Sequence, residues 1–339
     1  MLMTAKPLNR APSVVSAVFL GLILVLAPAP ARADHPSVGL GSGVAGPIIT
    51  IPASTLPAGK WAASARVEWI SFRTFSDSQL VRFAENGIEA HSTASVASPS
   101  LSVAYGVTRT FTLGARLPYV ARRDVREGHL EGTIGEVHHH GDSRGVGDLT
   151  VMGEFLVWEQ ERAKIAVITG VKAPTGRTTA GGADRLETEH QPGSGSWDWL
   201  EGICWSGQVG FGSIDANMLT TFASQGAQET NLGTLFTYNA SISAKVAGGH
   251  THSHGPGAEG GVGADLILEL NGEARTRQKI AGVRDPNSGG NLVYLSPGVR
   301  FGPEQWSASF SFGVPILQNL NGTQHETDWR ILVGVGTSF

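Results

Sequence analysis

The last twelve residues, 328–339, constrain the fold of this chain more than any other stretch. Their side chains alternate between two faces. One face carries Trp329, Ile331, Val333, Val335, Thr337 and Phe339, and the other carries Arg330, Leu332, Gly334, Gly336 and Ser338. A period of two predicts a β-strand with one face toward an apolar medium and one toward a polar or crowded one.

The chain ends on an aromatic residue, Phe339. A terminal Phe that closes an alternating strand resembles the ending of bacterial outer-membrane β-barrel proteins, where the barrel-assembly machinery recognises it. We therefore expect that machinery and outer-membrane lipid as partners. The alternative is the final strand of a soluble β-sandwich.

The first 33 residues predict a secretory signal peptide. Lys6 and Arg10 supply the positive charge, residues 14–26 are apolar, and Ala31-Arg32-Ala33 is a small-x-small cleavage site. No later stretch has the roughly 18–20 continuous apolar residues of a membrane-spanning helix. Any membrane insertion must therefore use strands. Residues 34–59 have no periodicity and are rich in Gly, Pro and Ser. They are expected to form a flexible periplasmic leader, with a plug-like segment as the other interpretation.

Alternation recurs along the rest of the chain and predicts an all-β fold: a transmembrane up-and-down antiparallel barrel of about twelve strands over residues 60–339. The predicted strands are 60–73, 100–107, 111–119, 148–157, 164–172, 196–208, 214–222, 232–246, 265–271, 293–301, 306–316 and 328–339. The stretch 196–208 is the least regular, because Glu201 shares the parity of three tryptophans.

The predicted connections differ in length on the two rims. Short turns fall at 108–109, 159–162, 210–212 and 302–305, and long polar loops fall at 74–93, 122–144, 174–195, 275–290 and 318–327. Short periplasmic turns and long extracellular loops are typical of outer-membrane barrels. An exception is the long Gly/His insertion at 247–261, which falls on the short-turn rim.

Composition agrees with a barrel and excludes several functions. The chain is rich in Gly (45) and poor in charge (16%), with a formal net charge of −4 that becomes more negative once the signal peptide is removed. Binding of nucleic acid is not expected, because it requires a basic surface. The single cysteine, Cys204, excludes an internal disulfide.

Several segments together resemble one family. They are Ser98-Pro99-Ser100-Leu101, Arg116-Leu117-Pro118-Tyr119-Val120, Gly145-Val146-Gly147-Asp148-Leu149-Thr150, Lys172-Ala173-Pro174-Thr175-Gly176-Arg177-Thr178, Arg185-Leu186-Glu187-Thr188, Gln191-Pro192-Gly193-Ser194-Gly195-Ser196-Trp197-Asp198, Asp285-Pro286-Asn287-Ser288-Gly289-Gly290 and Leu320-Asn321-Gly322. The set resembles the meta-pathway phenol-degradation family of bacterial outer-membrane β-barrel proteins, also described as transporters. The resemblance covers about residues 56–339. It implies passage of small, often aromatic or hydrophobic, molecules across the bacterial outer membrane, and it supplies no catalytic residue.

Charged residues on the strands fall mostly on the parity away from lipid. An Arg or Lys facing lipid at mid-depth would cost about 2–4 kcal/mol. We therefore expect the lumen to be lined by Arg66, Glu68, Arg116, Asp148, Glu154, Lys172, Asp198, Asp215, Lys245, Asp265, Glu269, Arg300 and Arg330. These residues could border a small hydrated pore, or they could pair into a network that closes the barrel.

Two histidine clusters are candidate metal ligands. His138, His139 and His140 lie in a predicted loop, and His250, His252 and His254 lie in the insertion. Closely spaced imidazoles can bind zinc, nickel or copper weakly, with an affinity that falls as the pH drops toward about 6.5. The alternative is two solvated loops without a ligand. No cofactor is otherwise expected.

Enzymatic activity is not expected. Residues 170–178 have one residue too many for a phosphate-binding loop, and Arg177 stands where such a loop has lysine. Every histidine lies in the leader or a predicted loop, whereas outer-membrane hydrolases place the catalytic histidine on a strand. The expected function is an outer-membrane channel for small solutes. The alternatives are a closed structural or adhesive barrel and a metal-handling outer-membrane protein.

Overall fold

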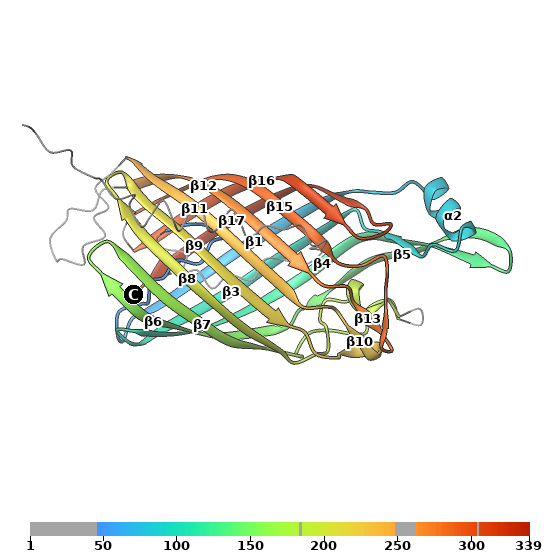
Figure 1. Ribbon diagram of the computed structural model, residues 1–339, viewed down its shortest axis with the longest axis horizontal. Coiled ribbons are helices and arrows are strands. Elements are labelled where there is room, and N and C mark those ends of the chain that lie inside the picture. The colour runs from blue at the N-terminus through green and yellow to red at the C-terminus, as the bar shows by residue number, and fades with distance from the viewer. Residues whose placement is uncertain (1–45, 183–184, 248–261, 304) are drawn as a thin grey trace, which may run out of the picture.

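Twelve antiparallel strands form a closed barrel, as the alternation predicted (Figure 1). The computed structural model describes residues 46–182, 185–247, 262–303 and 305–339. The barrel strands are β1 (Trp61–Arg73), β3 (Ser95–Thr108), β4 (Phe111–Glu131), β6 (Leu149–Gln160), β7 (Ala163–Ala173), β8 (Asp198–Val209), β9 (Gly212–Phe222), β11 (Leu235–Ala247), β12 (Gly263–Arg275), β15 (Gly290–Gly302), β16 (Trp306–Leu320) and β17 (Glu326–Ser338). Pairing of β4 with β6 joins the two ends of this sheet.

The terminal strand β17 pairs with the first strand, β1. The register places Trp69 opposite Ile331, and Trp61 and Phe339 exchange two backbone hydrogen bonds of 2.9 and 3.0 Å. In β17 the alternation matches the prediction, since Arg330 and Leu332 are buried whereas Val333 and Val335 are exposed. The last strand is therefore a wall of the barrel and not the edge of a sandwich.

The irregular stretch 196–208 also forms a barrel strand, β8. Glu201 shares the outward face with Trp199, and its carboxylate accepts a hydrogen bond of 2.8 Å from the Trp199 indole N–H. Both residues lie near the start of β8, at the rim that carries the long connections. A charge on the outer face is tolerated there because the cost of facing lipid falls near the membrane interface.

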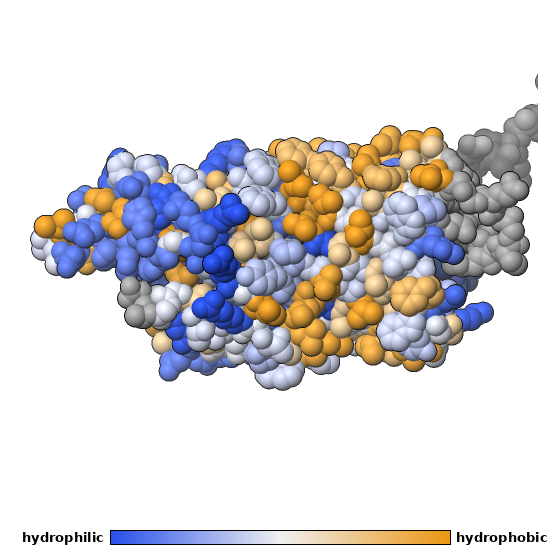
Figure 2. All heavy atoms as spheres, turned by 180° about the vertical axis from the view of Figure 1, so that it is seen from behind, coloured by the Kyte–Doolittle hydropathy of each residue, from blue (hydrophilic) through white to orange (hydrophobic). Residues whose placement is uncertain are grey.

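The outer wall is apolar. Exposed leucines, valines and aromatic residues follow the outward positions of the strands, for example Leu101, Leu268, Phe310 and Val335. Figure 2 shows hydrophobic residues gathered over the wall, while hydrophilic residues dominate the end at which α2 (Asp77–Glu85) projects. Among the described residues, no helix is long and apolar enough to cross a membrane.

Two of the predicted polar loops are ordered elements instead. The expected loop 122–144 is the outer half of a hairpin between β4 and β5 (Ile134–Val146), which projects beyond the barrel (Figure 1). The expected loop 74–93 contains α2 and the short strand β2 (Ala90–Ser92), which pairs with β4. The remaining connections carry the 3-10 turns η1 (Thr188–His190) and η2 (Ala227–Glu229) and a small sheet of β10 (Thr230–Asn231), β13 (Lys279–Ile280) and β14 (Val283–Arg284).

Local sequence explains why α2 forms. Ser76 and Gln79 make a reciprocal capping box that satisfies two backbone N–H groups of the first turn. Leu80 and Ala84 are buried on the side toward the hairpin. Gly128 of β4 allows the approach, since a Cβ there would stand 2.3 Å from the carbonyl oxygen of Leu80.

The opposite rim has the short turns that were expected, between β3 and β4, β6 and β7, β8 and β9, and β15 and β16. The start of β1 and the end of β17 lie on this rim, which is the periplasmic one in the usual orientation of such barrels. The signal peptide, leader residues 34–45 and the histidines of the insertion, His250, His252 and His254, lie outside the described residues.

Candidate solute pathway

Residues 46–59 of the predicted leader run from the barrel lumen to the short-turn rim. Residues 47–51 and Ala53 are buried, and the segment has neither helix nor strand structure. This described part of the leader corresponds to the plug-like interpretation. Alternation could not predict it, because the buried part of the segment, residues 47–53, belongs to no strand and therefore has no period.

The lumen segment 46–59 is held by hydrogen bonds to side chains on six different strands. The Glu269 carboxylate on β12 accepts from the N–H groups of Ile49 and Thr50 at distances of 2.9 to 3.1 Å. Further backbone N–H groups donate to Asn217, Ser206, Glu154 and Thr112, and the Arg300 guanidinium donates to the Pro47 carbonyl oxygen at 2.7 Å. Side chains on the inner wall thus replace the water that this backbone would otherwise bind.

One side of the lumen is apolar. Ile51 and Ala53 of the lumen segment pack in a buried cluster with inward side chains of four neighbouring strands, β6 to β9. These are Met152, Ala166, Ile168, Leu200, Cys204 and Leu219. The lumen segment therefore covers an inner surface to which an apolar solute could bind.

The other side of the lumen is charged. Arg330 on β17 lies 3.1 Å from Glu273 and 3.6 Å from Glu68, measured between guanidinium and carboxylate atoms. Its guanidinium also donates to Asn271 and stacks over the Tyr294 ring at 3.9 Å. Only 1% of the Arg330 side chain is exposed. Buried charges of this kind persist because they are paired and hydrogen-bonded.

The other predicted lumen residues occupy varied surroundings. Arg116, Asp215, Glu269 and Arg300 are buried, Arg66, Glu154 and Asp265 are partly buried, and Lys245 is exposed near the periplasmic end of β11. Asp215 accepts hydrogen bonds from Ser206 and Ser213 and so supports the serine that binds Ala53. Asp265 lies between Lys245 and Arg300 in the sheet register.

Three further predicted residues lie together at the extracellular mouth. Lys172 is 2.5 Å from Asp198 and 3.4 Å from Asp148. The Asp148 carboxylate also accepts from the N–H groups of Gly176 and Ser194. Asp148 therefore fastens both ends of the 174–197 connection, whose residues Leu186 and Gln191 are buried in the mouth.

The three predicted histidine ligands that the structure describes, His138, His139 and His140, do not converge on one point. His138 and His140 share one face of β5, with ring centroids 4.4 Å apart, whereas His139 lies 3.9 Å from Asp77 of α2. His140 contacts Glu127 at 3.1 Å. Strand geometry explains the split, since successive side chains on a strand point to opposite faces.

A different histidine cluster lies at the mouth. His91, Glu189 and His190 bring three metal-ligating atoms within 4.8 Å of one another. Burial disfavours the charged His91 imidazole, but the carboxylates of Glu127, Glu189 and Glu187 outweigh it and raise the pKa of His91 to about 10. Sequence reasoning missed this cluster because about 100 residues separate its two parts and no short spacing marks it.

Comparison with known families identifies the chain. The sequence profile described as "Putative MetA-pathway of phenol degradation" matches residues 100–316, which is more than half of the chain. The chain belongs to this family. The match includes eight of the twelve barrel strands in full, and it confirms the resemblance drawn from the loop motifs.

Solved structures similar to this family member are outer-membrane barrels. An outer membrane channel from Pseudomonas putida F1 superposes with a TM-score of 0.53 at 12% identity, over 85% of this chain and 98% of that one. The NanC porin gives a TM-score of 0.41 at 6% identity, over 83% and 99% of the two chains. The β-domain of the Bordetella autotransporter BrkA gives 0.42 at 10%, over 84% and 100%. No curated protein matches the sequence. With its apolar outer wall, this family member is an integral barrel of the bacterial outer membrane.

Proposed function

We propose that this protein is a non-enzymatic outer-membrane channel for small solutes, aromatic and hydrophobic ones among them, and that the lumen segment 46–59 regulates its opening. The observation that carries the proposal is the apolar inner wall on β6 to β9, which Ile51 and Ala53 cover. When the lumen segment moves aside, this wall would offer an apolar surface to a solute.

The attachment of the lumen segment suits a displaceable plug. The segment adds no strand to the barrel, and its backbone is held by side-chain acceptors that can bind water instead. A typical hydrogen bond contributes only about 0.5–1.5 kcal/mol net. The segment can therefore leave the lumen without disturbing the pairing of the barrel strands.

A specific observation favours the second candidate, a closed structural barrel. Arg330, Glu68 and Glu273 form a buried charge cluster on the side opposite the apolar wall. If this cluster and the lumen segment fill the cross-section of the barrel permanently, no path for a solute remains. The two functions differ in whether solute crosses the outer membrane.

Solute uptake tests the proposal. The protein would be produced in a bacterial strain that lacks its general porins, and uptake of a labelled aromatic acid and of a labelled sugar would be compared. We expect faster uptake of the aromatic compound than in cells with the empty vector. Replacement of Cys204 by Trp, which adds bulk to the apolar wall, should slow aromatic uptake. Equal aromatic uptake with and without the protein would favour the closed barrel.

We further propose that Phe339 is the contact for the barrel-assembly machinery. Its side chain is 64% exposed while its backbone is paired with Trp61. Replacement of Phe339 by Ser should leave the backbone pairing possible but reduce the amount of folded protein in the outer membrane. Unchanged amounts of folded barrel would contradict this role.

A further inference from the structure

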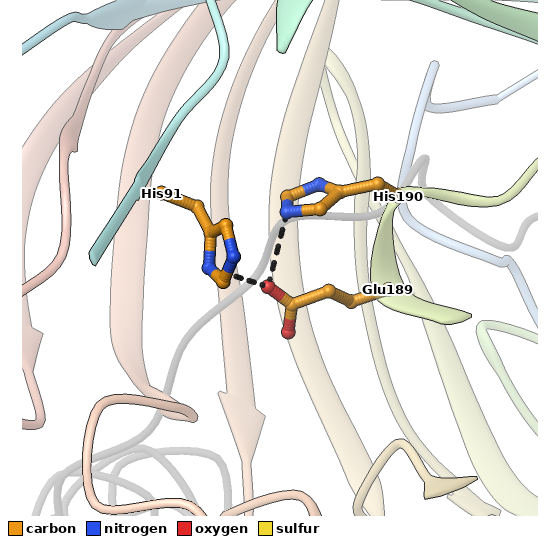
Figure 3. A group of neighbouring side chains, drawn as sticks. All are labelled: His91, Glu189 and His190. Carbon is orange, nitrogen blue, oxygen red and sulfur yellow. Dashed lines mark ion pairs between the residues drawn. The ribbon is translucent and has the colours of Figure 1, made fainter. Parts of the chain in front are cut away.

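A compact set of imidazole and carboxylate groups lies at the extracellular mouth, apart from the lumen segment. His91 lies on β2, and Glu189 and His190 lie on η1, in the connection between β7 and β8. Figure 3 shows the two imidazoles and the Glu189 carboxylate turned toward one another from these two elements. They border a cavity of about 370 Å³, whose other side is formed by Gln278, Asp285 and Thr323.

Two of the three separations among these groups match those of ligands around one small cation, and the third is within 4.8 Å. Glu189 Oε1 lies 3.3 Å from His190 Nε2 and 3.6 Å from His91 Nδ1. Two ligand atoms at about 2.1 Å from a tetrahedral zinc ion are about 3.4 Å apart. A cation could therefore bind all three atoms with small side-chain movements.

The other ring nitrogen of His91 faces two carboxylates, and carboxylates are common hydrogen-bond partners of metal-bound histidines. His91 Nε2 lies 3.7 Å from carboxylate oxygens of both Glu127 and Glu187. A ligating histidine commonly donates its second N–H to a carboxylate, which fixes the ring and strengthens the metal bond. Glu127 is held in place because it lies opposite His91 in the β2–β4 register.

The η1 side of the cluster is also preorganised. Thr188 donates its hydroxyl to the Ala227 carbonyl oxygen at 2.8 Å. The Gln191 side chain bonds to the backbone of Ala180 and Leu186. The Glu189 and His190 backbone is thus fixed on both sides before any ligand binds. Support from surrounding contacts distinguishes a preorganised metal site from histidines on an exposed loop.

Charge at the cluster favours a cation. Glu89, Glu127, Glu187 and Glu189 surround the two imidazoles, and a second possible ligand set of Glu89, His91 and Glu187 shares His91. Mixed nitrogen and carboxylate ligands suit first-row divalent ions such as Zn²⁺ better than Mg²⁺ or Ca²⁺.

We propose that His91, Glu189 and His190 bind a first-row divalent cation, for which Zn²⁺ is the probe, and that the bound ion joins β2 to the connection between β7 and β8 across the channel mouth. This site differs from the histidines of β5 and of the insertion, and it does not depend on the channel function proposed above.

Zinc titration of the full-length mature protein tests the site. The protein would carry no histidine tag, and His250, His252 and His254 would be replaced by Ala so that the insertion cannot contribute. After removal of metal by a chelator, calorimetry should find one Zn²⁺ per chain. His91→Asn and Glu189→Gln should each weaken binding by at least about tenfold, the usual size of such losses in metal sites. His139→Ala is the matched control and should bind as the parent does.

Cobalt provides a second readout that does not depend on affinity alone. Co²⁺ bound to the parent should give visible absorption bands of a four- or five-coordinate site, and Glu189→Gln should change the spectrum of any ion that still binds. Heat-modifiable migration on gels would confirm that each variant keeps a folded barrel. Absence of Zn²⁺ binding by the folded parent, or equal affinity in the parent and in Glu189→Gln, would overturn the proposal.

Discussion

The Glu269 carboxylate accepts a hydrogen bond of 2.9 Å from the backbone N–H of Thr50, although 219 positions separate the two residues in sequence. This contact joins the lumen segment to the barrel wall at a residue with only 1% exposure. It makes Glu269 the strongest single attachment of the segment, because the same carboxylate also accepts from Ile49.

Glu269→Ala should loosen the lumen segment. Hydrogen bonds to a charged acceptor contribute about 1.5–3 kcal/mol, so loss of this one should raise the displaced population about tenfold or more. Cys204 reports the change, since it is the only cysteine and is buried under Ile51 and Ala53. Maleimide should modify Cys204 about ten times faster in the variant than in the parent. Glu159→Ala, at the exposed end of β6, is the control, and equal rates in all three proteins would contradict the attachment.

Arg330→Ala should destabilise the barrel. The change leaves the Glu68 and Glu273 carboxylates buried without their shared cation, and such losses cost about 3–5 kcal/mol. Urea unfolding in detergent would measure the free energy of unfolding. The double variant Arg330→Met/Glu273→Gln should lose less, because one uncompensated charge is removed. A double variant less stable than Arg330→Ala would argue against charge pairing as the cause.

Asp148→Ala should release the connection that fills the mouth. Asp148 holds Gly176 and Ser194 at the two ends of this connection, and Arg177 and Arg185 within it are trypsin sites. We expect faster tryptic cleavage at these arginines in intact detergent-solubilised barrels. Asp142→Ala, in the exposed β4–β5 hairpin, should leave the cleavage rate unchanged. Protection of both arginines in Asp148→Ala would show that other contacts hold the connection.

Gly128→Val should undock α2 from the β4–β5 hairpin. A side chain at Gly128 would collide with the backbone of Leu80, and β-strand backbone cannot move aside easily. Hydrogen exchange should become faster for amides of residues 77–85 and stay unchanged in the barrel strands. Leu130→Ala, nearer the hairpin tip, is the control. Slow exchange of α2 in Gly128→Val would mean that the helix does not need this close contact.

Alternation predicted the barrel because each wall residue faces one of two media. Val333 and Arg330 show the rule in β17, and Glu201 shows its limit, where a strand reaches the interface and polarity no longer separates the faces. The helix α2 carries a recognisable capping box at Ser76 and Gln79, so a closer search of the 74–93 connection could have found it.

The sequence allowed a plug-like segment within residues 34–59, but the contacts of the lumen segment and of the mouth cluster could not be predicted, for a different reason. Thr50 meets Glu269, and His91 meets Glu189, only after the barrel has closed. Neither pair has a spacing, a period or a motif that marks it. The consecutive histidines 138–140 are conspicuous in sequence, but strand geometry separates them onto two faces.

Single-channel conductance in a planar bilayer tests the central claim most directly. The mature protein would be compared with a variant that lacks residues 34–55 and keeps every barrel strand. The channel account predicts small, infrequent openings for the mature protein and a stable, larger conductance for the truncated variant. A folded truncated barrel that remains silent over a range of voltages and salt concentrations would contradict a channel regulated by its lumen segment.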